Sequence, residues 1–262
     1  VDDALLTSES LVYIDGVPVQ AVDRHHREVL LTEKARGGET FQVAIEAFAG
    51  MNPGLRTFAL ADLACIDREA EGLYFDARNA LEAARLLDDD SLTKVTVLNA
   101  LHDAFLALEP RHPRGEVWHQ SLVRAREVLR QRLAAFEDGR QPTIVSIGHA
   151  HIDVAWLWPL SVTRGKAART FSTALKLMEQ YPDYHFTQSQ PPLYRFVQED
   201  HPDLFQRIRE RVREGRWEPT GGMWVEADTN VPAGEALVRQ FLFGKRYFRR
   251  EFGVDNQLLW LP

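Results

Sequence analysis

The sequence has one cysteine among its 262 residues, no long apolar run and no excess of basic side chains. A single cysteine, Cys65, excludes a disulfide within the chain, and we expect it to be buried as a small apolar side chain. Without a signal peptide or a membrane-spanning run, a reducing cytoplasmic setting is favoured and no membrane partner is expected. The 31 basic and 38 acidic side chains give a net charge of −7, so nucleic acid is not expected as the main partner. Whether the protein forms a homo-oligomer is open from the sequence alone.

The first half of the chain changes pattern once, which suggests two regions. Residues 1–66 contain alternating stretches around Asp15-Gly16, a pair typical of tight hairpins, and predict a small antiparallel β unit. Residues 67–140 instead repeat apolar residues at three- and four-residue steps in three stretches, and Pro110 and Pro113 separate the last two. These stretches predict three packed antiparallel helices.

The second half, residues 141–262, alternates predicted strands and helices. An apolar run at 143–147 is the first strand, and 256–262 is expected to be the fourth. Alternation of this kind predicts an α/β fold with parallel strands, either an open doubly wound sheet or part of a barrel. Since four strands cannot close a barrel, we expect the sequence to stop within a domain.

A histidine-rich segment, HAHID, follows the first predicted strand. Its polar residues, His149, His151 and Asp153, are two positions apart, so in an extended chain their side chains leave the same face. Imidazole nitrogen and carboxylate oxygen together suit a metal such as zinc. The alternative is a strand-end histidine that is only hydrogen-bonded to the aspartate, and the pattern alone leaves both open.

Two tryptophans, Trp156 and Trp158, follow this segment. They either cap the core or form a stacking platform for a sugar ring, whose C–H face suits an aromatic surface.

A second polar cluster follows the third predicted strand, where Trp224, Glu226 and Asp228 are again two apart. Asp228 either binds loop amides or adds a third ligand beside His151 and Asp153. Gln188 and Gln190, after the second strand, are expected as polar rim groups that contact substrate or hold loops together.

Several blocks between Thr143 and Pro262 resemble the catalytic domain of glycoside hydrolase family 38, the class II α-mannosidases. They occur in the family's order: GHAHIDVAWLWP, RTFSTALKLMEQYP, FTQSQPPLY, EGRWEPTGGMWVEADTN, GEALVRQFLFGKRYF and LWLP. The stretch LVYIDGVPVQAVDRHHREVLL is similar to the region that precedes this domain in the cytosolic and bacterial branch.

The resemblance implies a seven-stranded β/α barrel, here reaching its fourth strand, in a zinc-dependent or cobalt-dependent enzyme. Its substrates would be terminal α-mannosides of oligosaccharides, hydrolysed with retention. His151 and Asp153 would be metal ligands, Asp228 both a ligand and the nucleophile, and Trp156 a platform for mannose. The last metal ligand and the general acid are expected beyond Pro262, so this piece alone would bind metal weakly and turn over no substrate.

Two other functions compete with this one. A metal-dependent barrel hydrolase such as a sugar deacetylase would use the same ligands to activate a water molecule. A noncatalytic carbohydrate-binding segment would need the aromatic platform but no metal.

Overall fold

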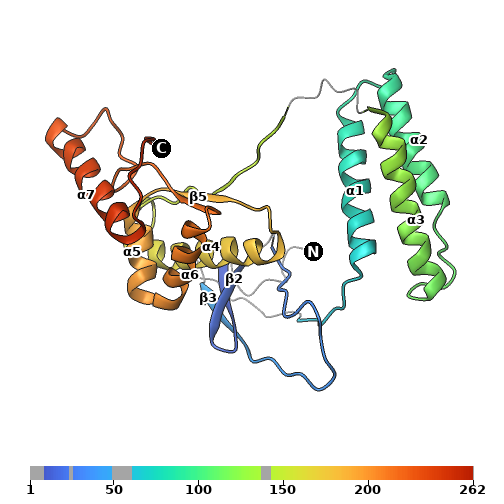
Figure 1. The fold of residues 1–262 in the computed structure, drawn as a ribbon, viewed down its shortest axis with the longest axis horizontal. Helices are drawn as coiled ribbons and strands as arrows, with labels where there is room; N and C mark the ends of the chain where they lie inside the picture. The colour runs from blue at the N-terminus through green and yellow to red at the C-terminus, as the bar shows by residue number, and fades with distance from the viewer. Residues whose placement is uncertain (1–8, 24–25, 49–60, 137–142, 262) are drawn as a thin grey trace. The chain divides into compact units, whose positions relative to one another are not determined.

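The computed structural model describes residues 9–23, 26–48, 61–136 and 143–261, which divide into two compact units. One unit joins the N-terminal part, up to Leu60, with residues 145–262; the other spans residues 61–144. The chain is mixed α/β (Figure 1). Among the described residues, no helix is both long enough and apolar enough to cross a bilayer.

The N-terminal strands form an antiparallel sheet in the order β2-β1-β3, with bounds Glu9–Ile14 for β1, Val17–Asp23 for β2 and Val43–Phe48 for β3. Asp15 and Gly16 join the first two strands, and both have positive φ (51° and 82°), as the two-residue turn of a type I′ hairpin requires. The hairpin expected at this pair is therefore present.

This sheet packs on helix α4, which spans Leu160–Gln180. The backbone N–H of Ala21 donates to Thr173 Oγ1 at 2.8 Å, and Glu9 is paired with Lys166 and Arg169 of the helix. Burial alone would raise the pKa of Glu9, but the two cations outweigh it and hold the pKa below its usual value. The β unit is thus attached to the helix that follows the HAHID segment.

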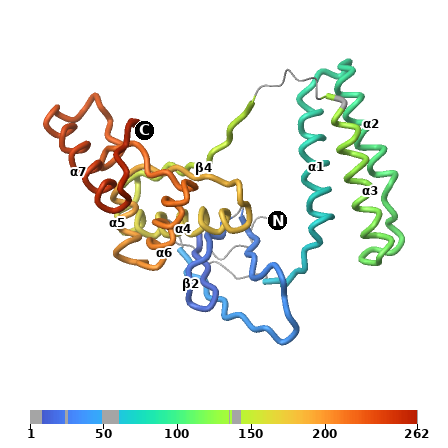
Figure 2. Tube along the Cα trace, viewed as in Figure 1, coloured from blue at the N-terminus to red at the C-terminus, as the bar shows by residue number. Residues whose placement is uncertain are grey.

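The second unit contains three helices, α1 (Arg68–Arg85), α2 (Leu92–Leu106) and α3 (Glu116–Leu133), and a short 3₁₀ turn, η1 (Ala134–Phe136). The helices lie side by side (Figures 1 and 2) and fall within the three stretches of helical period. Asp67 caps the first helix by accepting from two backbone amides, and Ser91 caps the second. Small alanine side chains recur in the shared core and allow the helices to approach closely.

Cys65 is exposed, so the expectation that it would be buried is wrong. It lies in the extended segment before α1, where no neighbouring element of the described chain covers it. Local sequence indicated a small apolar side chain but could not show that its segment lies outside the helical core.

Three short strands form the parallel sheet, β4 (Gly148–His149), β5 (Phe186–Gln188) and β6 (Trp217–Pro219), in that order. Helix α4 connects the first two strands, α5 (Pro191–Asp200) and α6 (Pro202–Arg213) connect β5 to β6, and α7 (Gly234–Phe252) follows β6. The alternation predicted from the sequence is therefore present, although no barrel is closed by the described strands.

The first predicted strand, 143–147, is wrong in position. Only Gly148 and His149 pair, each with one residue of β5, and residues 143–147 are irregular. Ile144 and Val145 are 83% and 77% exposed, so their apolar side chains have no layer of the described chain to pack against. A strand needs both a backbone partner and a covered face, and the run has neither here.

The fourth predicted strand is also wrong, because the described residues 256–261 form no strand. The segment is anchored instead by side-chain bonds. Asn256 Nδ2 donates to the Pro219 carbonyl at 2.6 Å, and Lys245 Nζ donates to the Asn256 carbonyl at 2.9 Å. These bonds hold the segment beside the end of β6 without a strand ladder.

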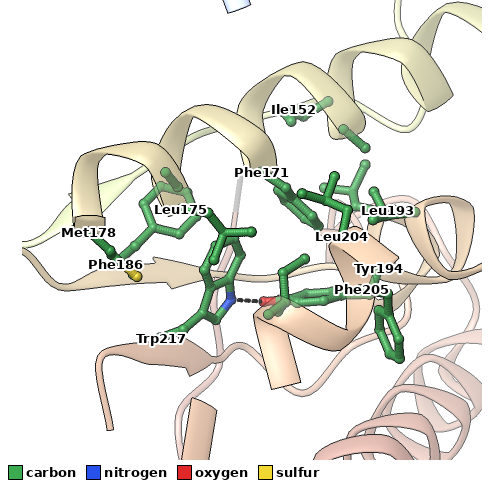
Figure 3. Close-up of a cluster of buried hydrophobic side chains, with 14 of the residues drawn as sticks. Ile152, Phe171, Leu175, Met178, Phe186, Leu193, Tyr194, Leu204, Phe205 and Trp217 are labelled. Atoms are coloured by element: carbon green, nitrogen blue, oxygen red, sulfur yellow. Dashed lines mark hydrogen bonds between the residues drawn. The ribbon is translucent and has the colours of Figure 1, made fainter. Parts of the chain in front are cut away.

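The core between α4 and the parallel sheet is aromatic (Figure 3). The rings of Phe171 and Trp217 meet edge to face with centroids 5.2 Å apart. Trp217 Nε1–H donates to Tyr194 Oη at 2.9 Å, and that hydroxyl donates to the Gln188 carbonyl at 2.8 Å. The core therefore contains a short hydrogen-bond chain that fixes α5 against β5 and β6.

Replacing Tyr194 with Phe removes both hydrogen bonds and leaves the Trp217 N–H buried without a partner. We expect the free energy of unfolding to fall by about 1–3 kcal/mol, the cost of an unmet buried polar group. Urea unfolding followed by tryptophan fluorescence measures it. Tyr181→Phe, at an exposed position of the same unit, is the control and should unfold as the wild type does. Equal stability of all three proteins would contradict the role of this hydrogen-bond chain.

Candidate functional site

The carboxyl ends of the parallel strands bring three polar side chains together. His151 Nε2 lies 3.2 Å from Asp153 Oδ1, and His151 Nδ1 lies 3.1 Å from Glu226 Oε2. His151 and Asp153 follow β4, whereas Glu226 follows β6, so the contact joins segments 75 residues apart in the chain. These side chains line a small pocket of about 110 Å³. The pairing of His151 with Asp153 expected from their spacing is present.

Gln190 connects the two loops that carry these residues. Its Nε2 donates to the Ile152 carbonyl at 2.8 Å, and its Oε1 accepts from the Glu226 backbone N–H at 3.3 Å. Gln190 itself is buried and has a left-handed backbone (φ 64°) at the start of α5. Of the two functions left open for this residue, the structure shows that it holds loops together.

Gln188, by contrast, is fully buried in β5, so its side chain is not a rim group. Neither atom of its side-chain amide has a hydrogen-bond partner in the described structure. The strand alternation explains this position, because Phe186 and Gln188 leave the same face of β5 and Phe186 belongs to the core.

His149 is held away from the pocket by the backbone. Its Nδ1 lies 3.0 Å from the Thr187 carbonyl, and its ring lies against Trp260 with centroids 4.4 Å apart. The first histidine of HAHID is therefore a packed strand residue, and only the second one reaches the pocket.

Asp228 is exposed and faces its own loop. Its Oδ1 accepts from the backbone N–H of Asn230 at 2.8 Å, which is the Asx-turn geometry typical of aspartate in loops. Within residues 9–23, 26–48, 61–136 and 143–261, no three His, Cys, Asp or Glu side chains are arranged to bind one metal ion. Two of the three expected metal ligands, His151 and Asp153, lie together. The third, Asp228, is bound to its own loop in this conformation.

Trp156 is 66% exposed next to the pocket segment. Its ring meets Trp158 edge to face with centroids 5.5 Å apart. Trp158 is fixed by a 3.0 Å hydrogen bond from its Nε1 to Thr163 Oγ1 and by Lys166 over its ring. One tryptophan is thus anchored to α4, and it supports the other, whose ring remains available to a ligand.

The loop after β6 is held by close packing against α7. A Cβ at Gly244 would lie 2.2 Å from the Gly222 carbonyl oxygen, so only glycine allows this approach. The Trp224 N–H donates to the Gln240 carbonyl and the Val225 N–H to Gln240 Oε1, at 2.9 and 2.8 Å. The helix therefore fixes the backbone immediately before Glu226.

Glu226, which the sequence placed in the second polar cluster without a role, and Ser189, which it did not single out, both belong to the site. Ser189 Oγ donates a short hydrogen bond to Glu226 Oε1, and the Glu226 side chain is only 4% exposed. The one signal in the sequence was the two-residue spacing of Glu226 and Asp228, which does not show which of the two enters the pocket.

The comparisons with known proteins agree on one family. Residues 141–262 match the sequence profile described as Glycosyl hydrolases family 38 N-terminal domain. The chain is 32% identical to "Alpha-mannosidase G" of Dictyostelium discoideum and 34% identical to "Alpha-mannosidase 2C1" of Mus musculus, each over 97% of its length. The chain belongs to glycosyl hydrolase family 38.

The family 38 relatives are much longer than this chain. It spans 25% of the Dictyostelium protein and 26% of the mouse protein, and 19% of "Alpha-mannosidase" of Saccharomyces cerevisiae, to which it is 36% identical over 77% of its own length. The chain thus corresponds to about a quarter of the first two proteins.

Replacing Gln190 with Asn tests the link between the loops. Asn tolerates the left-handed backbone but is one methylene shorter, so it cannot reach both Ile152 and Glu226. We expect a loss of about 1–3 kcal/mol in the free energy of unfolding and faster hydrogen exchange at the Glu226 amide. Gln257→Asn, an exposed position, is the control. Unchanged exchange at Glu226 would contradict the role assigned to Gln190.

Proposed function

We propose that this family 38 chain belongs to a retaining α-mannosidase that hydrolyses terminal α-D-mannosides of oligosaccharides. The observation that supports the proposal is the His151–Asp153 pair beside an exposed Trp156 at the carboxyl ends of parallel strands. The relatives bear the name α-mannosidase, which gives the substrate class. In this proposal residues 141–262 begin the catalytic domain, and β4–β6 are part of a seven-stranded β/α barrel.

Trp156 is proposed to bind the sugar. Its open face can stack on the C–H face of a mannose ring, while the anchored Trp158 keeps the ring from rotating away. Stacking there would place the sugar beside the pocket that His151 and Asp153 line.

Asp228 is proposed as the nucleophile. Its carboxylate attacks the anomeric carbon, the bond to the leaving oxygen breaks, and an acid protonates that oxygen; water then releases the mannose. Asp228 is exposed and its one described hydrogen bond is local, so turning from Asn230 toward the pocket costs about 0.5–1.5 kcal/mol. The acid, which lies about 5–5.5 Å from the nucleophile in retaining enzymes, is proposed to lie outside residues 1–262.

A divalent metal, zinc or cobalt, is proposed as the cofactor. His151 and Asp153 offer the nitrogen and oxygen donors that such metals accept, and Asp228 would be the third ligand once turned. When bound, a metal at this position would supply positive charge beside the reacting sugar. The described conformation holds only two of these donors together, so the metal remains part of the proposal.

The proposed setting is the cytoplasm. Cys65 is an exposed thiol and the sequence has no second cysteine to pair with it, which suits a reducing compartment. The proposed partner is a soluble mannose-containing oligosaccharide.

Replacing Asp228 with Asn in the intact enzyme tests the nucleophile. We expect kcat for an aryl α-mannoside to fall by about 10³-fold or more, because the covalent step is lost. A 2-deoxy-2-fluoro mannosyl fluoride should add one sugar mass to the wild type, on the peptide that contains Asp228, and none to the variant. Glu235→Gln, at an exposed position in the first turn of α7 where the side chain is paired with Arg239, is the control. Labelling of another residue, or full activity of D228N, would contradict the assignment.

A further inference from the structure

One carboxylate of the N-terminal β unit bridges two cations of helix α4. Glu9, the first residue of β1, pairs with Lys166 Nζ through Oε1 at 2.5 Å and with Arg169 through Oε2. The two cations are three positions apart, so they lie on the same face of the helix. The three side chains are 33%, 21% and 10% exposed, so water screens this cluster less than it screens an ion pair on the open surface. Glu9 therefore fixes where both cations lie.

Each of these cations also lies over an aromatic ring. Lys166 Nζ is 4.8 Å from the centroid of the Trp158 ring, and Arg169 Cζ is 5.6 Å from that of Phe48 in β3. Both distances are within the range of about 6 Å in which a cation is attracted to a ring face. Since Phe48 is opposite Glu9 in the ladder of β1 and β3, the contact of Arg169 stays within the β unit. The contact of Lys166 leads instead to the tryptophans next to the pocket.

Trp158 is held at its edge as well as over its face. Its Nε1–H donates to Thr163 Oγ1 at 3.0 Å, and Thr163 is fully buried in the first turn of α4. The ring of Trp156 meets Trp158 edge to face, but Trp156 itself is 66% exposed. Trp158 is its one aromatic neighbour in the part of the chain that the structure describes. The orientation of the exposed ring thus depends on that of the held ring.

We propose that Glu9 and Lys166 are positioning residues for the sugar platform. Glu9 holds the ammonium group of Lys166 on the face of Trp158, and Trp158 then sets the orientation of Trp156. The β unit thereby takes part in substrate binding, although none of its described residues lines the pocket beside His151. The inference rests on the proposed function only in taking Trp156 as the surface on which mannose stacks; the coupling of Lys166 to the two rings does not.

Indole NMR of the ¹⁵N-labelled chain tests the coupling without substrate. Lys166→Met removes the charge but keeps an unbranched side chain that favours the helix. We expect the indole signals of Trp156 and Trp158 to shift, and their N–H groups to become more mobile on the picosecond-to-nanosecond timescale. Lys166→Arg should keep the wild-type mobility, because a guanidinium also binds a ring face. The two signals are assigned by their loss in Trp156→Phe and Trp158→Phe, and unchanged mobility of Trp156 in K166M would overturn the proposal.

Two further variants keep the test decisive. Glu9→Gln keeps the shape of the side chain but removes its charge, and should raise the mobility of both indoles by less than K166M does. Lys176→Met, at another lysine of α4 that is paired with Glu179, is the control and should match the wild type. Wild-type mobility in E9Q would overturn the proposal even if K166M failed to fold, and so would an equal change in K176M. The indole signal of the buried Trp217 reports folding in each variant.

Kinetics of the intact enzyme with an aryl α-mannoside then test the consequence for substrate binding. We expect KM to rise about 2–5-fold in K166M with kcat unchanged, because a stacking surface binds the sugar equally before and during the reaction. Trp156→Ala should raise KM further, and K166M should add nothing in that background, since both changes act through one ring. A fall in kcat alone, or additive effects of the two substitutions, would overturn the positioning role.

The same variants separate this inference from the proposed function. If W156A left KM unchanged, the sugar platform of the proposed function would fail. The NMR mobility of Trp156 in K166M and E9Q would then decide alone whether Glu9 and Lys166 position the ring.

Discussion

The side chain of Gln190 is the constraint on which the site depends. Its amide donates to the carbonyl of Ile152 and accepts from the N–H of Glu226, so one buried residue holds the ends of two strands at a fixed separation. An amide suits this position because it offers a donor and an acceptor at once. His151 is held through its neighbour Ile152, whose carbonyl accepts from Gln190. Glu226 is held directly, because its own backbone N–H donates to Gln190.

The aromatic core places Gln190 correctly. Tyr194 lies one helical turn further along α5 and binds both Trp217 and the Gln188 carbonyl, so the start of α5 is fixed relative to β5 and β6. Gly244 completes the frame, since α7 approaches the loop after β6 too closely for any other residue. The packed core thus fixes the positions of the polar groups at the carboxyl edge of the sheet, where parallel α/β folds carry their functional sites.

The sequence predicted what depends on local spacing. The strand–helix alternation, the hairpin at Asp15-Gly16 and the pairing of His151 with Asp153 each follow from neighbours in the chain. The strands predicted at 143–147 and 256–262 are absent from the described residues of these segments, because pairing and burial depend on other parts of the chain. Glu226, rather than Asp228, enters the pocket because of long-range bonds to Ser189 and Gln190, which two-residue spacing cannot show.

Anomalous diffraction from crystals of the intact enzyme grown with zinc tests the central claim most directly, namely that the strand ends form one metal site beside an aromatic sugar platform. We expect a zinc peak within bonding distance of His151 Nε2 and Asp153, with Asp228 turned from Asn230 to the metal. A zinc peak elsewhere, or zinc in the pocket with Asp228 still bound to the Asn230 amide, would contradict it.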